Sequence, residues 1–213
     1  MQNISRLLFR CRHIRYFNTY VFDINPEVKS ALCEHRPVVA CETAILTHGL
    51  PRPSNIETCL NIEQIIRENG STPATIAILN GRVKVGLTKI ELEQLGSSNN
   101  VEKASRRDLP YLISRRASAG TTVSATMLIA HRCGILLVAT GGIGGVHRDS
   151  TTTGDISSDL DELGRTPVCV VSSGVKSILD IPKTLEYLET KGVGGISYKK
   201  TISLCFFLSL YIW

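Results

Sequence analysis

The sequence predicts an α/β fold, a three-layer α/β/α sandwich in which helices cover both faces of a mixed central sheet. Short β-rich runs alternate with helical patterns along most of the chain, and two of these runs flank a hairpin signal. No internal repeat or linker interrupts the pattern. Since 213 residues with 43% hydrophobic content suffice for one sizeable core, we expect a single domain.

The first elements have clear start and stop signals. Pro37–Cys41 (PVVAC) is typical of a buried strand. Ser54–Glu57 (SNIE) has the spacing of a helix-capping box, and it opens a stripe of apolar residues at helical spacing that ends at Gly70. Thr75–Leu79 and Arg82–Leu87 flank an Asn-Gly pair, which predicts a β-hairpin with a two-residue turn.

The second part of the chain continues the alternation. Thr88–Glu91 forms another capping box, which predicts a short helix ending at Gly96. The remaining predicted elements are a helix over 121–132, a fully buried strand over Ile135–Ala139, a helix over Ser158–Leu163, a strand over Pro167–Ser172 and a helix over Lys183–Thr190.

The first 22 residues (MQNISRLLFRCRHIRYFNTYVF) contain four arginines, interleaved with apolar side chains, and no acidic residue. A secretory signal would need a longer apolar run, whereas this composition is typical of a mitochondrial transit peptide. We therefore predict a transit peptide over residues 1–23 and a mitochondrial location. The alternative is a disordered basic tail on a cytoplasmic protein.

The formal net charge of +5 lies mostly in this leader. Without its four arginines the chain has 20 basic and 19 acidic residues, so its body is nearly neutral and offers no electrostatic argument for nucleic acid. Residues 203–213 (SLCFFLSLYIW) are almost wholly apolar, but 11 residues are too few for a membrane-spanning helix, which needs about 20. We expect no membrane partner, and this run is either a buried strand or an aggregation-prone segment.

Lys176 lies just beyond the predicted strand Pro167–Ser172, after a corner at Gly174. Ser177–Leu179 begins an apolar helical pattern. A lysine at such a corner points into the cleft at the carboxyl end of a sheet, where open α/β folds bind ligands. The positive end of a following helix and a desolvated pocket both disfavour the ammonium form, so the amine is a candidate nucleophile. The alternative is a solvated lysine at the start of a helix.

Two further features follow predicted strands. Glu42 ends the first strand, and a partly desolvated carboxylic acid there can have its pKa raised toward neutrality and act as a general acid. Thr140–Arg148 (TGGIGGVHR) has four glycines that let the backbone approach a ligand, with amides free to bind an anion. It matches neither the dinucleotide fingerprint nor the Walker loop. A flexible turn and a phosphate-binding loop both remain open.

Two polar segments lie outside these strand ends. The segment DISSD, residues 155–159, supplies several oxygen ligands, which suits a hard cation such as Mg²⁺ or Mn²⁺ that keeps its waters. Its alternative role is a helix N-cap. Lys103 precedes Ser105–Asp108 (SRRD), a cationic cluster that could contact a phosphate, with a solvated loop as the alternative.

Several segments, in this order, resemble the pseudouridine-5′-phosphate glycosidase family, and they cover residues from about 25 to 196 nearly without a gap. The resemblance implies an α/β/α fold, usually a homotrimer. It also implies reversible cleavage of the C–C glycosidic bond of pseudouridine 5′-phosphate to uracil and ribose 5-phosphate, with a divalent metal, typically Mn²⁺. The segments are PVVACETAILTHGLPRPSN, TPATIAILNGRVKVGLT, KASRRDLP, GTTVSATM, VATGGIGGVHR and DISSDLDELGRTPVCVVSSGVKSILDIPKTLEYLET.

Carried over motif by motif, the resemblance implies that Lys176 is the Schiff-base nucleophile, Glu42 the proton donor and Asp155 the metal-linked aspartate. Because the bond broken is C–C, no glycosidic oxygen is available for protonation, and the usual two-carboxylate scheme lacks its leaving group. An amine that attacks the anomeric carbon provides an alternative route. The candidate substrate contacts are Lys103, Val123, Thr140, His147, Ser157, Ser158 and Asp159.

The resemblance ends near Ser197. We therefore expect residues 24–200 to form a glycosidase-like domain whose C-terminal part is missing, and residues 201–213 to be an unmatched apolar tail. Some family members also carry a sugar-kinase-like domain. Two other functions stay open: an inactive truncated fragment that binds a phosphosugar, and a phosphate-binding enzyme of another kind, such as a Schiff-base aldolase.

Overall fold

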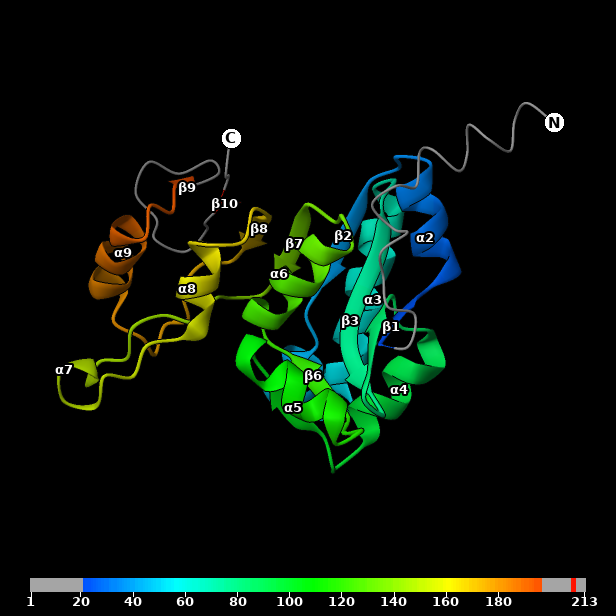
Figure 1. The fold of residues 1–213 in the computed structure, drawn as a ribbon, viewed down its shortest axis with the longest axis horizontal. Coiled ribbons are helices and arrows are strands. Elements are labelled where there is room, and N and C mark those ends of the chain that lie inside the picture. The colour runs from blue at the N-terminus through cyan, green and yellow to red at the C-terminus, as the bar shows by residue number, and fades with distance from the viewer. Residues whose placement is uncertain (1–20, 197–207, 210–213) are drawn as a thin grey trace.

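The computed structural model describes residues 21–196 and 208–209, which fold around a single mixed β-sheet (Figure 1). The main path of the sheet has strands in the order β1, β4, β3, β2, β7, β8, β10 and β9. Off this path, the short strand β6 pairs with β3, and β5 pairs with β6. Their bounds are β1 (Phe22–Ile24), β2 (Val38–Cys41), β3 (Thr72–Leu79), β4 (Arg82–Val85), β5 (Glu102–Ala104), β6 (Ala119–Thr121), β7 (Leu137–Thr140), β8 (Cys169–Ser172), β9 (Gly195–Ile196) and β10 (Leu208–Ser209).

The helices between these strands are mostly short. In the described part of the chain they are α2 (Pro26–Cys33), the π-helix η2 (Ile45–Gly49), α3 (Ser54–Glu68), α4 (Lys89–Ser97), the 3₁₀-helix η3 (Arg106–Asp108), α5 (Leu109–Ser114), α6 (Val123–Arg132), α7 (Ser150–Thr153), α8 (Ser158–Leu163) and α9 (Ile181–Thr190).

Two hydrophobic clusters lie on opposite faces of the sheet. Along β3, Ile76 and Ile78 pack into one cluster and Ala77 into the other, as the alternation of side chains along a strand requires. The first cluster includes residues of α2, α5, α6, α8 and α9, and the second includes residues of α3 and α4. The three-layer α/β/α sandwich is therefore confirmed.

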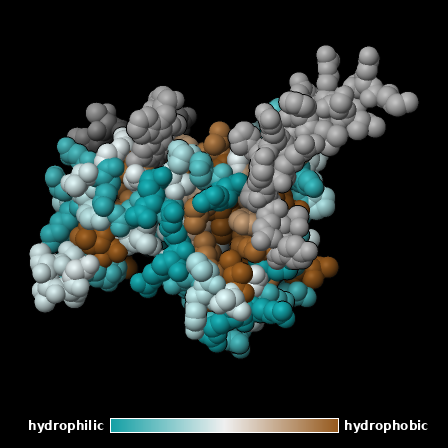
Figure 2. All heavy atoms as spheres, viewed as in Figure 1, coloured by the Kyte–Doolittle hydropathy of each residue, from teal (hydrophilic) through white to brown (hydrophobic). Residues whose placement is uncertain are grey.

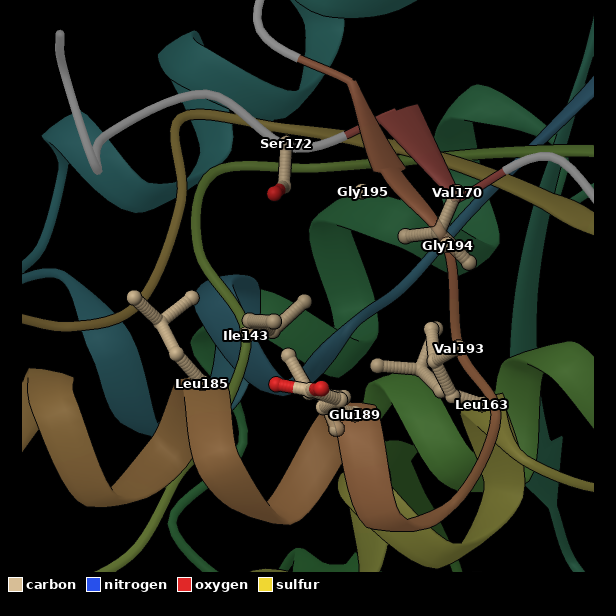
Figure 3. A pocket seen from close by; sticks show the side chains of 10 residues that line it. Ile143, Leu163, Val170, Ser172, Leu185, Glu189, Val193, Gly194 and Gly195 are labelled. Atoms are coloured by element: carbon tan, nitrogen blue, oxygen red, sulfur yellow. The ribbon is translucent and has the colours of Figure 1, made fainter.

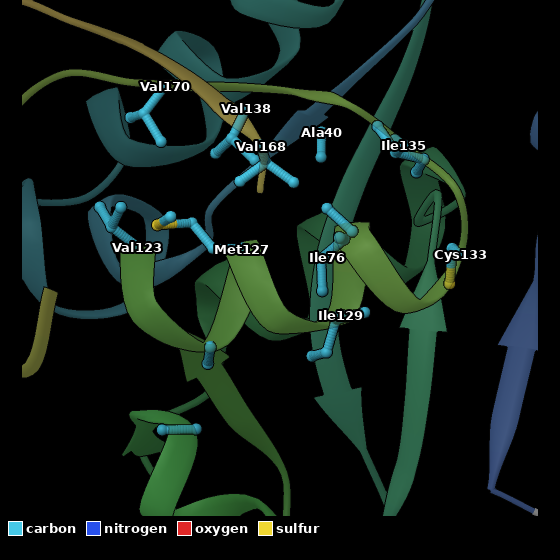
Figure 4. Packing of buried hydrophobic residues seen from close by; sticks show 14 of the residues in the cluster. Ala40, Ile76, Val123, Met127, Ile129, Cys133, Ile135, Val138, Val168 and Val170 are labelled. Carbon is cyan, nitrogen blue, oxygen red and sulfur yellow. The ribbon is translucent and has the colours of Figure 1, made fainter. Parts of the chain in front are cut away.

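Helix α6 contributes much of the first cluster. Its side chains Val123 and Met127 point toward Val138 of β7 and Val170 of β8 (Figure 4). All four are almost fully buried. This packing holds the start of α6 close to the ends of the central strands. On the outside, hydrophilic residues cover much of the face in view, while hydrophobic ones gather near its centre (Figure 2).

The central strands bring distant segments together. β3, β2, β7 and β8 are mutually parallel neighbours, and parallel strands end at the same edge of a sheet. Glu42 follows β2, the glycine-rich segment begins at the end of β7, and Lys176 follows β8. The topology therefore delivers all three predicted features to one edge, where ligands of open α/β sheets bind.

The predicted hairpin and the second capping box are confirmed. β3 and β4 pair antiparallel, and Asn80 and Gly81 of the turn have φ of 50° and 76°, as a type I′ turn requires. The hydroxyl of Thr88 accepts from the amide of Glu91, whose carboxylate accepts from the Thr88 amide in return. The first capping box is wrong, since Ser54 is already helical and its hydroxyl donates to the Pro51 carbonyl.

Two elements near the start of the body were not predicted. β1 pairs with β4, and α2 follows it, capped by the Asn25 side chain with Pro26 at its first turn. Since β1 begins at Phe22, the sheet starts inside the segment predicted as a leader. The rest of that leader lies outside the described residues.

Several other boundaries shift by a few residues. The predicted strands Ile135–Ala139 and Pro167–Ser172 begin two residues later, as β7 and β8, whereas the predicted helix over Ser158–Leu163 is present with the same bounds as α8. Within the apolar tail only Leu208 and Ser209 are described, as β10 beside β8. In the described ranges 21–196 and 208–209, no helix is both long and apolar enough to cross a membrane.

Candidate active site

A cavity of about 570 Å³ opens at the carboxyl edge of the parallel strands. Nine of the ten residues predicted for the site line it, although they come from six separate stretches of the sequence. Their convergence places a carboxylic acid, an amine and several hydroxyl and cationic groups around one space. The nine residues are Glu42, Lys103, Val123, His147, Asp155, Ser157, Ser158, Asp159 and Lys176.

Glu42 is buried, with 9% of its surface exposed, and its Oε1 accepts a 2.6 Å hydrogen bond from the Thr140 hydroxyl. Burial raises the pKa of the Glu42 carboxyl above its usual range, and the negative charge of Asp159 adds to that effect. The Thr140 hydrogen bond and the positive charges of Lys176 and Lys103 act in the opposite direction, but the balance is upward. The group is therefore suited to donating a proton.

Thr140 does not line the main cavity. It is the tenth predicted residue, and its hydroxyl is directed to Glu42 on the neighbouring strand. With Glu42 it also borders an apolar cavity of about 200 Å³ that includes Cys41 and Cys59. The structure thus brings Thr140 to the acid and not to the space that the other nine residues surround.

The local structure around Lys176 differs from the prediction. Ser177–Leu179 forms a turn in which the Leu179 amide donates to the Lys176 carbonyl, and α9 begins only at Ile181. The predicted helix start is wrong because Asp180, four residues later, provides the N-cap, with its side chain accepting from the Lys183 amide. Lys176 is also exposed. No described helix therefore begins at Lys176, and its side chain is not buried.

A second cavity, of about 330 Å³, adjoins the first and shares Glu42, Lys103 and Lys176 with it. These three side chains therefore stand where the two spaces meet. His48 of η2 lines the smaller cavity, and partial burial together with the charge of Lys103 lowers its pKa. The sequence did not predict His48 as a site residue.

The glycine-rich segment is packed by its own hydrogen bonds. The amides of Gly142, Ile143, Gly144, Val146 and His147 all donate to acceptors within the protein. These amides are engaged, so they form no open anion-binding loop. The glycines are needed for close packing instead: a Cβ on Gly144 would lie 2.1 Å from the Ser157 hydroxyl.

Asp155 lies near His147, with 3.6 Å between its Oδ2 and the imidazole Nδ1. In the described part of the chain, no group of three or more His, Cys, Asp or Glu side chains is arranged to hold a metal ion. Mg²⁺ and ions like it are commonly held by one or two carboxylates, with water and substrate phosphate completing the shell. Asp155 and His147 fit a weakly held ion of that kind and not an all-protein cage.

The same segment also caps a helix. Ser157 is the N-cap of α8, and its hydroxyl accepts from the Asp159 amide. The N-cap alternative for DISSD is therefore realised at Ser157, while Asp155 stays available on the cavity surface.

The cationic cluster after β5 is divided by the fold. Arg107 lines the cavity with 89% of its side chain exposed, and Lys103 lines both cavities. Arg106 instead pairs with the buried Glu162 of α8, 2.7 Å away. Ser105 and Asp108 also line the cavity and hydrogen-bond to each other, although neither was predicted individually.

A separate apolar cavity of about 280 Å³ lies between α9, β8 and β9 (Figure 3). Apart from Glu189 and Ser172, its lining is aliphatic or glycine, and it contains none of the predicted site residues. Among the described residues its lining has no cationic side chain, so it is a poor match for a phosphorylated ligand.

Residues 27–210 match the family described as Indigoidine synthase A like protein, a range that runs past Ser197 into the apolar tail. The pseudouridine-5′-phosphate glycosidase of Caldanaerobacter subterraneus subsp. tengcongensis is 56% identical over 177 residues, which are 83% of this chain and 58% of that protein. The protein of the same name from Hahella chejuensis is 53% identical over 191 residues, which are 89% of this chain and 63% of that protein. The chain thus spans about three fifths of the length of these curated relatives.

Two solved structures share the fold. The crystal structure of a prealnumycin C-glycosynthase in complex with ribulose 5-phosphate superposes with a TM-score of 0.80 at 41% identity, covering 88% of this chain and 60% of that one. An indigoidine synthase A-like protein from Thermotoga maritima gives a TM-score of 0.73 at 38% identity, and the match covers 81% of this chain and 56% of that one. The three-layer architecture is therefore common to all three proteins.

Proposed function

This chain belongs to the family of indigoidine synthase A like proteins, and we propose that it carries the site of a pseudouridine-5′-phosphate glycosidase. The proposed reaction is the reversible cleavage of pseudouridine 5′-phosphate to uracil and ribose 5-phosphate. The observation that carries the proposal is the shared cavity of Glu42, a buried acid with a raised pKa, and Lys176, a lysine free of ion pairs within the described residues. The relatives named for this reaction, at 56% and 53% identity, support it.

In the proposed mechanism, Glu42 donates a proton to the ribose ring oxygen as the bond from that oxygen to C1′ breaks. The neutral amine of Lys176 forms a bond to C1′. The secondary ammonium that results gives a proton to the ionised carboxylate of Glu42. The lone pair freed on the nitrogen then forms a C=N bond while the electrons of the C–C bond leave with uracil, whose carbon takes up a proton. Water hydrolyses the iminium, which releases ribose 5-phosphate and restores the amine.

The phosphate is proposed to lie against the cationic side of the cavity. Arg107 and Lys103 provide positive charge, and the hydroxyls of Ser157 and Ser158 provide donors. Val123 begins α6 on the same cavity, where the Asp159 carboxylate accepts from the Ser124 amide and offsets the positive end of that helix. Lys103 also lines the second cavity, and we propose that it contacts the substrate between the sugar and the phosphate.

We propose Asp155, with His147, as the protein ligands of a divalent ion, Mn²⁺ in the first instance. When bound, such an ion would neutralise phosphate charge and orient the substrate. Asp155 then supplies one of the one or two carboxylates that commonly hold ions of this class beside a phosphate.

Borohydride trapping tests the proposed reaction. With ribose 5-phosphate present, reduction of the iminium should leave a covalent adduct that peptide mass spectrometry assigns to Lys176. In a separate assay without borohydride, the protein should consume uracil when ribose 5-phosphate is present, which is the reverse reaction. An adduct on another lysine, or none, would contradict the proposal. An adduct on Lys176 in a protein that does not consume uracil would favour a Schiff-base aldolase.

A phosphosugar-binding protein without turnover is the second candidate. It is favoured by the exposure of Lys176. Calorimetry with ribose 5-phosphate separates the two, since this candidate requires binding without a reducible adduct.

A homotrimer and mitochondrial import complete the proposal. Sedimentation analysis tests the first, and a fusion of residues 1–23 to a fluorescent protein tests the second. Hydrophobic residues exposed near the centre of one face support an interface with further copies (Figure 2). Import is supported by the basic, acid-free composition of the first 22 residues.

A further inference from the structure

We infer that Asp159 and Glu162, the two buried acidic residues of α8, are positioning residues that hold three other walls of the cavity in place. The kinetic test of this inference depends on the proposed function, whereas the hydrogen-exchange test does not. These walls are the start of α6, the glycine-rich segment after β7 and the turn η3. Each is joined to α8 by a carboxylate oxygen that accepts a hydrogen bond from that wall.

Asp159 joins two of the walls. It is 6% exposed, and its Oδ1 accepts from the Ser124 amide and its Oδ2 from the Gly144 amide, both at 2.9 Å. Ser124 lies in the first turn of α6, where backbone amides have no partner within the helix. One carboxylate thus satisfies an unpaired helix amide and anchors the glycine-rich segment.

Glu162 joins the third wall. It is 1% exposed and does not line the cavity, yet its Oε1 lies 2.7 Å from the Arg106 guanidinium and accepts from the Thr166 hydroxyl as well. A carboxylate this deeply buried is tolerated only when it is paired and hydrogen-bonded. Arg106 belongs to η3, and its neighbours Ser105 and Arg107 face the cavity.

A further contact ties the walls to one another. The Arg106 amide donates to the Ser124 hydroxyl at 3.4 Å, so η3 contacts α6 as well as α8. A shift at Glu162 is therefore transmitted to Arg107 and Ser105 through Arg106, and it reaches α6 along the same contact. Glu162 itself touches no substrate, so its effect on the reaction passes through these residues.

Asp161 provides a matched control on the same helix. It is 39% exposed and pairs with Lys191 at 2.7 Å, on the side of α8 that faces α9. The control Asp161→Asn removes one acidic charge from α8, as Glu162→Gln does. Only Glu162→Gln weakens a contact to a cavity wall.

The kinetic test compares Glu162→Gln with Asp161→Asn in the full chain. We expect Glu162→Gln to raise the KM for pseudouridine 5′-phosphate about tenfold, the size of one weakened charge-assisted hydrogen bond, with a smaller change in kcat. Asp161→Asn should leave both constants unchanged. A wild-type KM in Glu162→Gln, or an equal rise in both variants, would overturn the inference. If Glu162→Gln does not fold, Arg106→Lys takes its place.

Hydrogen exchange tests the same inference without catalysis. Amides of Ser105–Asp108 should exchange about tenfold faster in Glu162→Gln than in Asp161→Asn, because the weakened pair frees η3. Faster exchange in a chain that neither binds nor cleaves the substrate would reject the proposed function and support the positioning role. Equal exchange in both variants would overturn that role, whatever the activity.

Discussion

The hydroxyl of Thr140 donates a 2.6 Å hydrogen bond to Oε1 of Glu42, which links the ends of the neighbouring strands β7 and β2. This contact orients the buried acid and stabilises its ionised form. Thr140 therefore acts on the proposed proton donor rather than on the space that the substrate would occupy.

Replacing Thr140 with valine should move the alkaline limb of the pH–rate profile to higher pH. Glu42 donates its proton only when protonated, so activity falls as pH rises through its pKa. The Thr140 hydrogen bond lowers that pKa, and its loss raises it, so the protonated form persists to higher pH. Thr190→Val, which removes a surface hydroxyl bonded to the Glu186 carbonyl, is the control. An unshifted limb would show that the contact does not tune Glu42.

Replacing Glu42 with glutamine should leave ribose 5-phosphate binding nearly intact and slow uracil release by about 10²–10⁴-fold, the usual scale for losing a general acid. The amide keeps the size of the side chain and the contact with Thr140 but donates no proton to the ring oxygen. Calorimetry and single-turnover kinetics measure the two quantities. If affinity fell in proportion to rate, Glu42 would be a binding residue.

Replacing Lys176 with arginine should abolish turnover, since a guanidinium cannot form an imine. The positive charge beside Glu42 is retained, so binding of the phosphosugar should change little. Lys183→Arg, at an exposed ion pair with Asp180, is the matched control and should behave as wild type. Retained C–C cleavage in Lys176→Arg would contradict the assignment of the nucleophile.

Replacing Asp155 with alanine should weaken the dependence of activity on Mn²⁺, because the carboxylate 3.6 Å from the His147 imidazole is lost. The exposed Asp149, which lies outside the cavity, provides the control Asp149→Ala. Metal titrations of both variants, followed by uracil release, make the comparison. Identical titrations would leave the DISSD segment as a helix cap only.

Replacing Gly144 with alanine should lower the free energy of unfolding by about 1–3 kcal/mol, the usual cost of forcing a methyl group into a packed site. The added Cβ would lie 2.1 Å from the Ser157 hydroxyl. Gly141→Ala is the control, since its Cβ would meet only Ile45, at 3.7 Å. Chemical denaturation of both variants decides the point, and equal stability would show that the segment relaxes freely.

The sequence by itself determined the fold class and most of its elements. Local patterns of apolar residues, together with capping and turn signals, identified β2, β3, β4 and the helices α3, α4, α6 and α8. These elements are encoded by periodicity and local turn chemistry. It missed β1 and the short strands β5 and β6, whose formation depends on pairing with distant strands. The sequence also predicted that a helix begins directly after Lys176, which is too early. An apolar pattern does not reveal which residue caps a helix.

Only the tertiary structure decided how the site residues relate to one another. Strand order and parallel register brought nine predicted residues to one cavity and turned Thr140 toward Glu42. Burial then determined the roles of like residues, exposing Arg107 while pairing its neighbour Arg106 with Glu162. A local sequence pattern cannot separate such neighbours, because charge pairing and desolvation depend on contacts between segments far apart in the chain.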